Sequence, residues 1–282
     1  MRSTLFLFIK SIPKSQMKLS FFKYQGTGND FIIADNRDGS FPYGNSLLIK
    51  KLCDRNFGIG GDGMILLENI PGYDFHMRYF NSDGIEGSLC GNGGRCIVRF
   101  ARETGIIDDK ASFSANDGGH HAIIVAGDHV SLRLHDVKDI ETDGKAYIIN
   151  TGSPHYVLFS VNIDSIDVVG EGKKIRYGRK YGEKGINVNF AEKTVNRILI
   201  RTYERGVENE TLACGTGSVA AAVCAVAGSE DGKKTVQVQT RGGLLEVTFE
   251  KTGESFSNIW LTGPAKMVYR GTVDTDNIMD LP

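Results

Sequence analysis

The sequence lacks an excess of charge of either sign, since 33 Lys and Arg residues stand against 34 Asp and Glu residues and the formal net charge is -1. It also has no basic stripe, and therefore lacks the electrostatic footprint of a nucleic-acid-binding protein. Beyond the first residues, no apolar stretch approaches the length needed to cross a membrane. We therefore expect neither a nucleic acid nor a membrane among its partners.

Closely paired cysteines are missing as well, although the chain has five cysteines. Five residues separate Cys90 from Cys96 and nine separate Cys214 from Cys224, which is not the spacing of a zinc knuckle. A disulfide framework is typical of small secreted chains rather than of a chain of 282 residues. The sequence thus predicts no metal site, reduced thiols and a cytoplasmic location.

The first sixteen residues differ from the rest of the chain. Their short apolar run lies between Arg2 and Lys10, but no small-residue cleavage site of a signal peptide follows it. Met17 begins a strand-like stretch, so residues 1–16 are interpreted as a disordered extension or as the product of a misassigned start. The remaining length favours two domains of ordinary size or one large domain.

Apolar and polar residues alternate in several segments, which is the pattern of strands rather than of helices. These segments are 75–79, 130–134, 236–238 and 245–249. One helix is predicted from Asn45 towards Cys53, and two more begin after glycine clusters, at 93–103 and 217–227. Gly228 ends the last helix, which is almost wholly apolar and is expected to be buried on all sides. Many strands with few helices predict an α+β fold, in which each sheet wraps around a helix.

A weak internal repeat links the two halves of the chain. Residues 79–96 read YFNSDGIEGSLCGNGGRC, and residues 203–220 read YERGVENETLACGTGSVA. The tyrosine that opens each segment lies eleven positions before a cysteine, Cys90 or Cys214, in a Cys-Gly-x-Gly motif that precedes a predicted helix. The two cysteines are 124 residues apart, about the length of one domain. The repeat predicts two pseudo-symmetric domains with a cleft between them.

A thiol at a helix N-terminus lies at the positive end of the helix dipole, near unpaired backbone N–H groups. Both effects lower a thiol pKa, so we expect Cys90 and Cys214 to ionise near neutrality and to exchange protons in both directions. The glycines that follow them let backbone N–H groups approach an anion. Face to face, the two sites would hold one carboxylate while one cysteine removes the α-proton and the other protonates the opposite face. Such a reaction inverts a stereocentre without a cofactor.

Other residues in these segments have structural as well as functional interpretations. Cys53, Cys96 and Cys224 are expected to be packed structural residues. Five polar residues are compatible both with turns or strand ends and with a functional site: Asn29, His155, Asn187, Glu204 and Arg205.

Five motifs occur in the order and at the spacing of one enzyme family: GTGNDF at 26–31, FNSDG at 80–84, CGNGGRC at 90–96, YERG at 203–206 and ACGTG at 213–217. From about Met17 to its C-terminus, the chain resembles diaminopimelate epimerases. The resemblance implies two pseudo-symmetric halves, each a β-barrel-like sheet around a central helix, formed by residues 17–135 with 264–282 and by residues 136–263. It implies conversion of LL-2,6-diaminopimelate to the meso isomer, in lysine and peptidoglycan precursor biosynthesis, without pyridoxal phosphate or a metal.

The resemblance also implies roles for individual residues. Cys90 and Cys214 match the acid–base pair, and His155 and Glu204 match positions that tune the cysteines. Tyr269 matches a dimer contact, so a homodimer is expected. The residues that match substrate contacts are Asn29, Asn81, Gly91, Asn92, Ser153, Asn187, Glu204, Arg205, Gly215 and Thr216, of which the helix-end pairs 91–92 and 215–216 match the sites that hold the reacting carboxylate.

Two positions depart from the family pattern. Ser153 stands where the family commonly has asparagine, and Gly63 stands where it often has glutamine. Both changes shorten side chains at the far end of the substrate, where Arg205 suits the distal carboxylate. Either water or a neighbouring side chain fills the gap, or the substrate differs.

Three alternative functions remain open at this point. A proline- or hydroxyproline-type racemase or epimerase would keep the fold and the reaction, but Arg205 and the asparagines favour a substrate with a second polar end. A cysteine hydrolase would use Cys214 as nucleophile and His155 as base, which leaves Cys90 without a role. A non-catalytic anion-binding module would use only the two helix ends.

Overall fold

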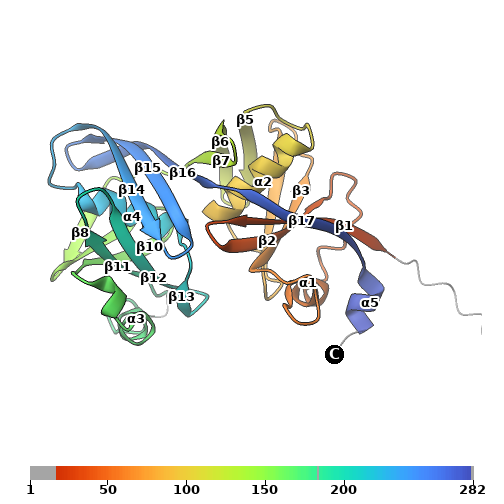
Figure 1. The fold of residues 1–282 in the computed structure, drawn as a ribbon, viewed down its shortest axis with the longest axis horizontal. Coiled ribbons are helices and arrows are strands. Elements are labelled where there is room, and N and C mark those ends of the chain that lie inside the picture. The colour runs from red at the N-terminus through yellow and green to blue at the C-terminus, as the bar shows by residue number, and fades with distance from the viewer. Residues whose placement is uncertain (1–16, 183, 281–282) are drawn as a thin grey trace, which may run out of the picture.

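The structure is a computed structural model that describes residues 17–182 and 184–280, so the interpretation of residues 1–16 falls outside the described residues. The chain folds into two lobes that lie side by side, with β16 (Ser255–Pro264) running between them (Figure 1). Each lobe has a curved sheet and one central helix. The predicted α+β fold with two similar halves is confirmed.

The N-terminal lobe contains most of the first half of the chain and its C-terminal end. Its elements are β1 (Lys18–Gly26), β2 (Asn29–Asp35), α1 (Ser46–Cys53), β3 (Gly63–Glu68), β4 (Phe75–Asn81), α2 (Gly91–Glu103), β5 (Lys110–Ala115), β6 (Gly118–Ala126), β7 (His129–Arg133), β17 (Lys266–Asp274) and α5 (Thr275–Asp280).

The C-terminal lobe contains the remaining elements. They are β8 (Ile140–Asp143), β9 (Ala146–Asn150), β10 (Pro154–Phe159), the 3₁₀ turn η1 (Ile163–Ser165), α3 (Val168–Arg176), β11 (Asn187–Lys193), β12 (Ile198–Glu204), β13 (Asn209–Thr211), α4 (Gly215–Ala225), β14 (Gly232–Thr240), β15 (Gly243–Thr252) and β16.

The two sheets share one pattern of strand pairing. In the N-terminal lobe the strands pair in the order β17, β1, β2, β3, β4, β5, β6, β7, with parallel pairs at β2–β3 and β4–β5 and antiparallel pairs elsewhere. In the C-terminal lobe the order β8, β9, β10, β11, β12, β14, β15, β16 has its parallel pairs at the equivalent places, β10–β11 and β12–β14. The last strands of the two series, β7 and β16, pair with each other and join the sheets. The weak sequence repeat therefore corresponds to a repeated topology.

The central helices α2 and α4 fill the two sheets. Nearly every residue of α4 is buried, from Gly217 to Cys224 without interruption, so its predicted burial is confirmed. Both helices begin two residues earlier than predicted, at Gly91 and Gly215, and α4 ends at Ala225 rather than at residue 227. The cysteine before each helix has an extended backbone and occupies the N-cap position, so the first glycine already has helical geometry.

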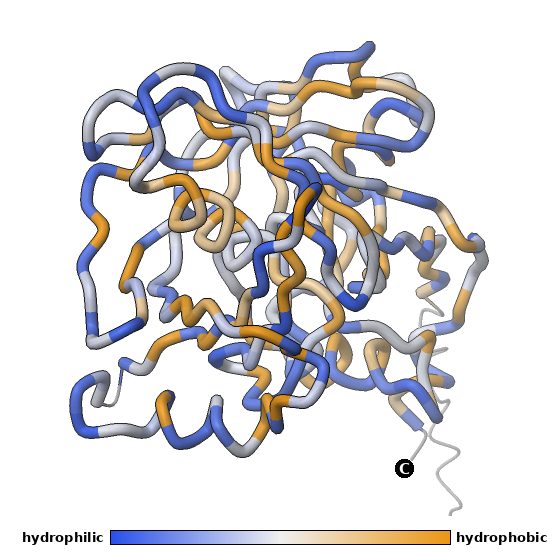
Figure 2. The backbone as a smooth tube through the Cα atoms, turned by 60° about the vertical axis from the view of Figure 1, so that its left-hand side comes forward, coloured by the Kyte–Doolittle hydropathy of each residue, from blue (hydrophilic) through white to orange (hydrophobic). Residues whose placement is uncertain are grey.

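Smaller elements also follow from local sequence. Helix α1 begins as predicted, because the side chain of Asn45 accepts a hydrogen bond from the backbone N–H of Leu48 at 3.1 Å. Apolar and polar residues are interspersed along the strands in Figure 2, as their alternation predicts. Helices α3 and α5 have no counterpart in the predicted elements. Within the described ranges, no helix is long and apolar enough to cross a membrane.

Candidate active site

The N-termini of the two central helices face each other. A Cβ atom added to Gly215 would lie 3.8 Å from the Cα atom of Gly91, at the start of the opposite helix. The side chain of Asn92 crosses this boundary and donates a hydrogen bond from Nδ2 to the backbone oxygen of Ala213 at 3.2 Å. The structure thus brings together two cysteines that are 124 residues apart in the sequence.

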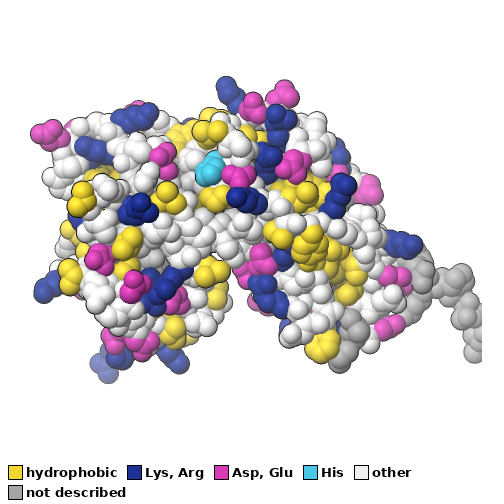
Figure 3. Space-filling model, in the orientation of Figure 1, with side chains coloured by type: hydrophobic (Ala, Val, Ile, Leu, Met, Phe, Trp, Pro, Cys, Tyr) yellow, Lys and Arg dark blue, Asp and Glu magenta, His cyan; other side chains and the backbone are white. Residues whose placement is uncertain are grey.

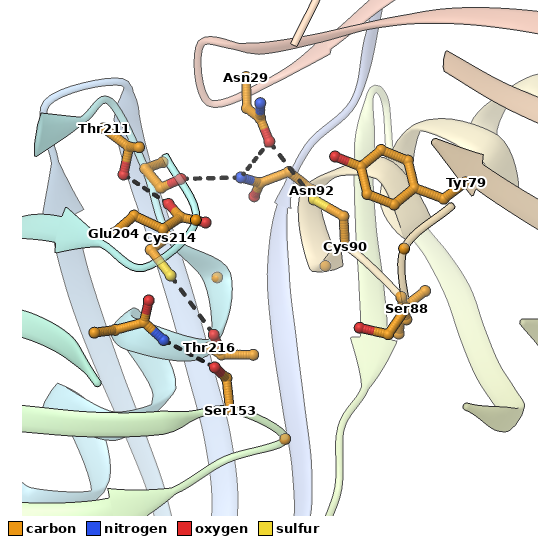
Figure 4. Close-up of a pocket in the computed structure, with 18 of the residues that line it drawn as sticks. Asn29, Tyr79, Ser88, Cys90, Asn92, Ser153, Glu204, Thr211, Cys214 and Thr216 are labelled. Carbon is orange, nitrogen blue, oxygen red and sulfur yellow. Dashed lines mark hydrogen bonds between the residues drawn. The ribbon is translucent and has the colours of Figure 1, made fainter. Parts of the chain in front are cut away.

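One large cavity, of about 1150 Å³, lies at this meeting point. It is lined by both cysteines and by every residue that the sequence predicts to contact substrate: Asn29, Asn81, Gly91, Asn92, Ser153, Asn187, Glu204, Arg205, Gly215 and Thr216. His155 is fully buried behind this lining, and Tyr269 lies elsewhere, on β17. In Figure 4, the side chains of the two lobes converge on the cavity from opposite sides.

On the N-terminal side of the cavity, Asn29 lies next to Cys90. Its Oδ1 atom accepts hydrogen bonds from Cys90 Sγ at 3.6 Å and from Asn92 Nδ2 at 3.2 Å (Figure 4). Its Nδ2 atom donates to Asp62 Oδ2 at 2.6 Å, and Arg55 forms an ion pair with Asp62 at 2.7 Å. The carboxylate therefore fixes the Asn29 amide with its oxygen towards the thiol. Sequence reasoning missed Arg55 and Asp62, whose only signal was a charged pair flanking a glycine-rich turn.

On the C-terminal side, three predicted residues form one polar cluster. Ser153 Oγ accepts hydrogen bonds from Asn187 Nδ2 at 2.9 Å and from Arg205 Nη2 at 3.4 Å. Asn187 Oδ1 in turn accepts from the backbone N–H of Arg205 at 2.9 Å. Ser153, which departs from the family pattern, is thus in direct contact with both neighbours. The cluster presents hydroxyl, amide and guanidinium groups, a set suited to a carboxylate.

His155 contacts Cys214 only through a third residue. Asn189 donates from Nδ2 to His155 Nδ1 at 3.1 Å, and bonds to neighbouring strands fix the orientation of that amide. His155 Nε2–H then donates to Thr216 Oγ1 at 2.9 Å, which leaves the Thr216 hydroxyl proton free to donate to Cys214 Sγ at 3.6 Å. Burial lowers the pKa of His155 to about 3, so the imidazole is neutral. A hydrolase mechanism needs this histidine beside the thiol, and the geometry argues against it.

The two cleft thiols do not have the lowered pKa values that we predicted. Burial raises the pKa of Cys90 to about 11, although backbone N–H groups of α2 act in the opposite direction. Burial, with the nearby carboxylate of Glu204, also raises the pKa of Cys214, against a hydrogen bond from Thr216. The expectation of ionisation near neutrality was therefore wrong for this structure. A sequence shows a helix end, but it does not show how much protein surrounds a thiol there, and in this structure Cys214 is buried and Cys90 is half-buried.

The carboxylate of Glu204 acts electrostatically on both cysteines. Its charge raises the pKa of both Cys90 and Cys214, and its own pKa is raised by burial. Its Oε2 atom accepts a hydrogen bond from the Thr211 hydroxyl at 2.8 Å (Figure 4). A cation bound at Glu204 would offset this effect on both thiols at once.

Tyr79 is a cavity residue that the sequence placed only in a strand and at the start of the repeat. Its ring helps to close the space at Gly63, since a Cβ atom added there would lie 2.4 Å from the Phe80 backbone oxygen and 2.6 Å from Tyr79 Cε2. Its hydroxyl donates to Asn81 Oδ1 at 3.0 Å, and Figure 4 shows the ring beside Cys90. The gap expected at Gly63 is thus closed by the Tyr79 side chain together with the backbone of β4. Tyr203, at the matching place in the repeat, instead points away and packs against α3 at Gly172.

Two solved structures with the same fold are distantly related to this chain in sequence. A phenazine biosynthesis protein of the PhzF family from Bacillus anthracis superposes with a TM-score of 0.72 at 16% identity, covering 91% of this chain and 99% of that chain. A hydroxyproline epimerase from Agrobacterium vitis superposes with a TM-score of 0.66 at 14% identity, covering 91% and 92%. At such identities the likeness shows the fold alone.

Sequence comparison gives a closer relationship. The family model for diaminopimelate epimerase matches residues 21–135 and 147–268. Diaminopimelate epimerase from Flavobacterium psychrophilum is 50% identical over 258 residues, which cover 91% of this chain and 100% of that protein. The enzyme of the same name from Chlorobaculum tepidum is 41% identical over 257 residues, covering 88% and 98%. Because the match to the family extends over both halves and both cysteine motifs, the chain belongs to the diaminopimelate epimerase family.

Proposed function

We propose that this isomerase converts LL-2,6-diaminopimelate to meso-2,6-diaminopimelate with Cys90 and Cys214 as its acid–base pair. One observation carries the proposal: two thiols at facing helix N-termini flank one cavity that is also lined by the cluster of Ser153, Asn187 and Arg205. An α-carbon held between the thiols would expose its proton to one of them and its opposite face to the other.

The reacting carboxylate would lie between the helix ends. Backbone N–H groups at Gly91, Asn92, Gly215 and Thr216 have no partners within their own helices, because they belong to the first turn. As the α-carbon loses its proton, negative charge moves onto the carboxylate oxygens. Preorganised donors and two positive dipole ends stabilise that charge more in the transition state than in the ground state.

Proton transfer then involves one bond at each thiol. A thiolate takes the α-proton, so the C–H bond breaks and an S–H bond forms. The opposite thiol gives its proton to the other face of the carbon and becomes the thiolate for the reverse reaction. The substrate α-ammonium group placed at Glu204 would offset the negative charge that raises both thiol pKa values. Since the thiols and helix ends provide base, acid and charge stabilisation, we propose that neither pyridoxal phosphate nor a metal takes part.

The far end of the substrate would lie at the cluster of Ser153, Asn187 and Arg205, opposite Asn81 and its partner Tyr79. A bidentate guanidinium suits a second carboxylate. Proline has no second polar end, so this cluster favours a diamino diacid over a cyclic imino acid. We propose that the chain has two domains, formed by residues 17–135 with 264–282 and by residues 136–263. The two domains close on the substrate, because water would otherwise compete for the α-carbon.

The reaction has a direct test by proton NMR. Reduced, folded protein incubated with LL-diaminopimelate in deuterated water is expected to form the meso isomer with deuterium at one α-carbon. The same experiment with trans-4-hydroxy-L-proline is expected to show no α-exchange above the uncatalysed rate. Exchange of hydroxyproline without exchange of diaminopimelate would replace the substrate assignment and keep the mechanism. If neither compound exchanges its α-proton, the proposal is wrong.

We also propose a cytoplasmic homodimer. The five cysteines of the chain are free in the structure, which fits a reducing compartment. Within the described residues, β17 pairs only with β1 and so is an edge strand. It exposes Met267, Val268 and Tyr269 at 44%, 58% and 44%, and Figure 3 shows hydrophobic side chains gathered over this part of the N-terminal lobe. A second copy would cover this edge.

Light scattering after gel filtration tests the dimer. Val268→Arg is expected to shift the wild-type dimer to a monomer, because it places a charge in the centre of the proposed interface. Val195→Arg is a matched control, since Val195 is fully exposed outside β17. A monomeric wild-type protein, or a Val268→Arg variant that stays dimeric, would contradict the proposed interface.

A further inference from the structure

Arg95 is a fully buried cation without an ionic partner. Its exposed fraction is 0%, and among the described residues no carboxylate lies within ion-pair distance of its guanidinium. Its Nε atom has no hydrogen-bond partner at all among those residues. Burial lowers its pKa, and in the part of the chain that the structure describes the titratable groups that oppose this effect are Cys96 and Cys90. A charge buried in this way costs stability, and a fold retains it only if something offsets the cost.

The acceptors around Arg95 are neutral. Nη2 donates to Asn92 Oδ1 at 2.9 Å and to Thr27 Oγ1 at 3.3 Å, and Nη1 donates to the Gly91 backbone oxygen at 3.3 Å. Two glycines leave room for the guanidinium, since a Cβ atom on Gly26 would lie 3.3 Å from Nη2 and one on Gly263 3.2 Å from Nε. The strand ends of β1 and β16 therefore form a slot for this side chain.

The slot lies directly behind the start of α2. The Asn92 side chain has its Oδ1 atom towards Arg95, from which it accepts a hydrogen bond. Its Nδ2 atom therefore points towards Asn29 and the other lobe. Asn29 contacts Cys90 through the same Oδ1 atom that accepts from Asn92. Arg95 is thus two hydrogen bonds from Asn29 and three from the thiol of Cys90. It also lies one helical turn from Gly91, whose backbone oxygen it contacts.

We propose that Arg95 is a positioning residue whose unpaired buried charge is the counter-charge for the negative charge that forms at the N-terminus of α2. This inference deepens the proposed function and rests on it for the identity of the anions. These are the Cys90 thiolate and the substrate α-carboxylate, which gains charge as the α-proton leaves. In a dry site the guanidinium adds a full positive charge to the partial charge of the helix end. It also fixes Asn92 in the orientation that spans the two lobes.

The proposal can be tested by giving Arg95 an ionic partner inside the slot. Thr27, which accepts a hydrogen bond from Arg95, is the position at which a carboxylate can be introduced. Its backbone φ is 53°, in the left-handed region where Asp and Asn are better tolerated than a β-branched residue. Thr27→Asp puts a carboxylate next to the guanidinium, whereas Thr27→Asn puts a neutral group of the same shape there. The two variants differ by one negative charge beside Arg95. Because that carboxylate can also act directly on Cys90, the same pair is compared in an Arg95→Met background, where the difference between Asp and Asn that depends on Arg95 is absent.

The readout is the pH dependence of Cys90 alkylation by iodoacetamide, followed at that residue by peptide mass spectrometry. The titratable groups that interact with Cys90 are Glu204 on β12, Tyr79 on β4, Cys214 before α4, and Arg95 and Cys96 on α2. With Glu204, Tyr79, Cys214 and Cys96 unchanged, Thr27→Asp is expected to raise the apparent pKa of Cys90 by about one unit, which is about tenfold in thiolate at a given pH. Thr27→Asn is expected to leave it unchanged.

Turnover of LL-diaminopimelate is measured on the same samples. Thr27→Asp is expected to lower kcat/KM by at least about tenfold, in line with the change in thiolate, and Thr27→Asn by less than about threefold. Arg95→Met, which removes the charge and keeps an unbranched side chain, is expected to keep or raise Tm while kcat/KM falls by at least about tenfold. Arg95→Lys is expected to recover part of the loss.

Equal pKa values and equal turnover in the Thr27→Asp and Thr27→Asn variants would overturn the role of Arg95. So would an Arg95→Met protein that melts earlier but turns over normally per folded molecule, since this is the result of a purely structural arginine. If the wild-type protein fails to epimerise diaminopimelate, that result contradicts the proposed function and not the role of Arg95. The alkylation measurement still reports on Arg95 in that case, because it needs no substrate.

Discussion

Cys90→Ala is expected to lower epimerisation of LL-diaminopimelate by at least about a thousandfold, because inversion needs a proton donor or acceptor on each face of the α-carbon. The remaining thiol, Cys214, can still act on its own face. From an analogue with a leaving group on the β-carbon, it can take the α-proton while the leaving group departs with its electron pair. The variant should therefore eliminate from one isomer of such an analogue and epimerise neither.

Chiral chromatography of the products and release of the leaving group measure the two activities separately. Cys214→Ala is expected to show the same loss of epimerisation with elimination from the opposite isomer. Cys224→Ala is the matched control, since this cysteine is buried in α4 and does not line the cavity. Near-normal epimerisation by Cys90→Ala would end the two-thiol mechanism, and loss of elimination from both isomers would show that one cysteine alone has no base activity.

The pairing of Cys90 with Cys214 was predictable because the signals are local. Each lies in a short motif in which glycines and a following apolar segment specify a helix start, and the motif occurs twice. Two copies of one motif imply two copies of one topology, and the strand pairings of the two lobes agree with that. The same reasoning gave the structural roles of the cysteines inside the helices, which are buried.

Other features depend on packing between segments far apart in the sequence. Tyr79 and Tyr203 hold the same place in the repeat, yet only Tyr79 faces the cavity, because the side-chain orientation depends on which surface of each strand is covered. The raised pKa values of Cys90 and Cys214 follow from burial, which no local pattern reports. The slot for Arg95 needs three segments, around Gly26, Asn92 and Gly263, to meet.

Arg205→Met is expected to weaken binding of LL-diaminopimelate by about a hundredfold to a thousandfold, which lies within the roughly 2–5 kcal/mol lost when one partner of a buried, hydrogen-bonded charge pair is removed. In the structure, the guanidinium is held by Ser153 Oγ at 3.4 Å and by the Lys184 backbone oxygen at 3.0 Å, neither of which is charged. Its charge is therefore available for an anion from the cavity. Arg179→Met is the control, because Arg179 is an exposed arginine outside the cavity lining.

If Arg205 binds the distal carboxylate, Arg205→Met should lower the affinity only for ligands that carry this carboxylate. Calorimetric titration in a Cys90→Ala background, where turnover does not interfere, compares LL-diaminopimelate with L-lysine, which differs by lacking that carboxylate. Arg205→Met should lower the affinity for LL-diaminopimelate towards that for L-lysine and leave the weaker binding of L-lysine nearly unchanged. An equal loss for both ligands would instead assign Arg205 to the shape of the cavity or to the reacting end, because a contact with the distal carboxylate cannot affect a ligand that has none.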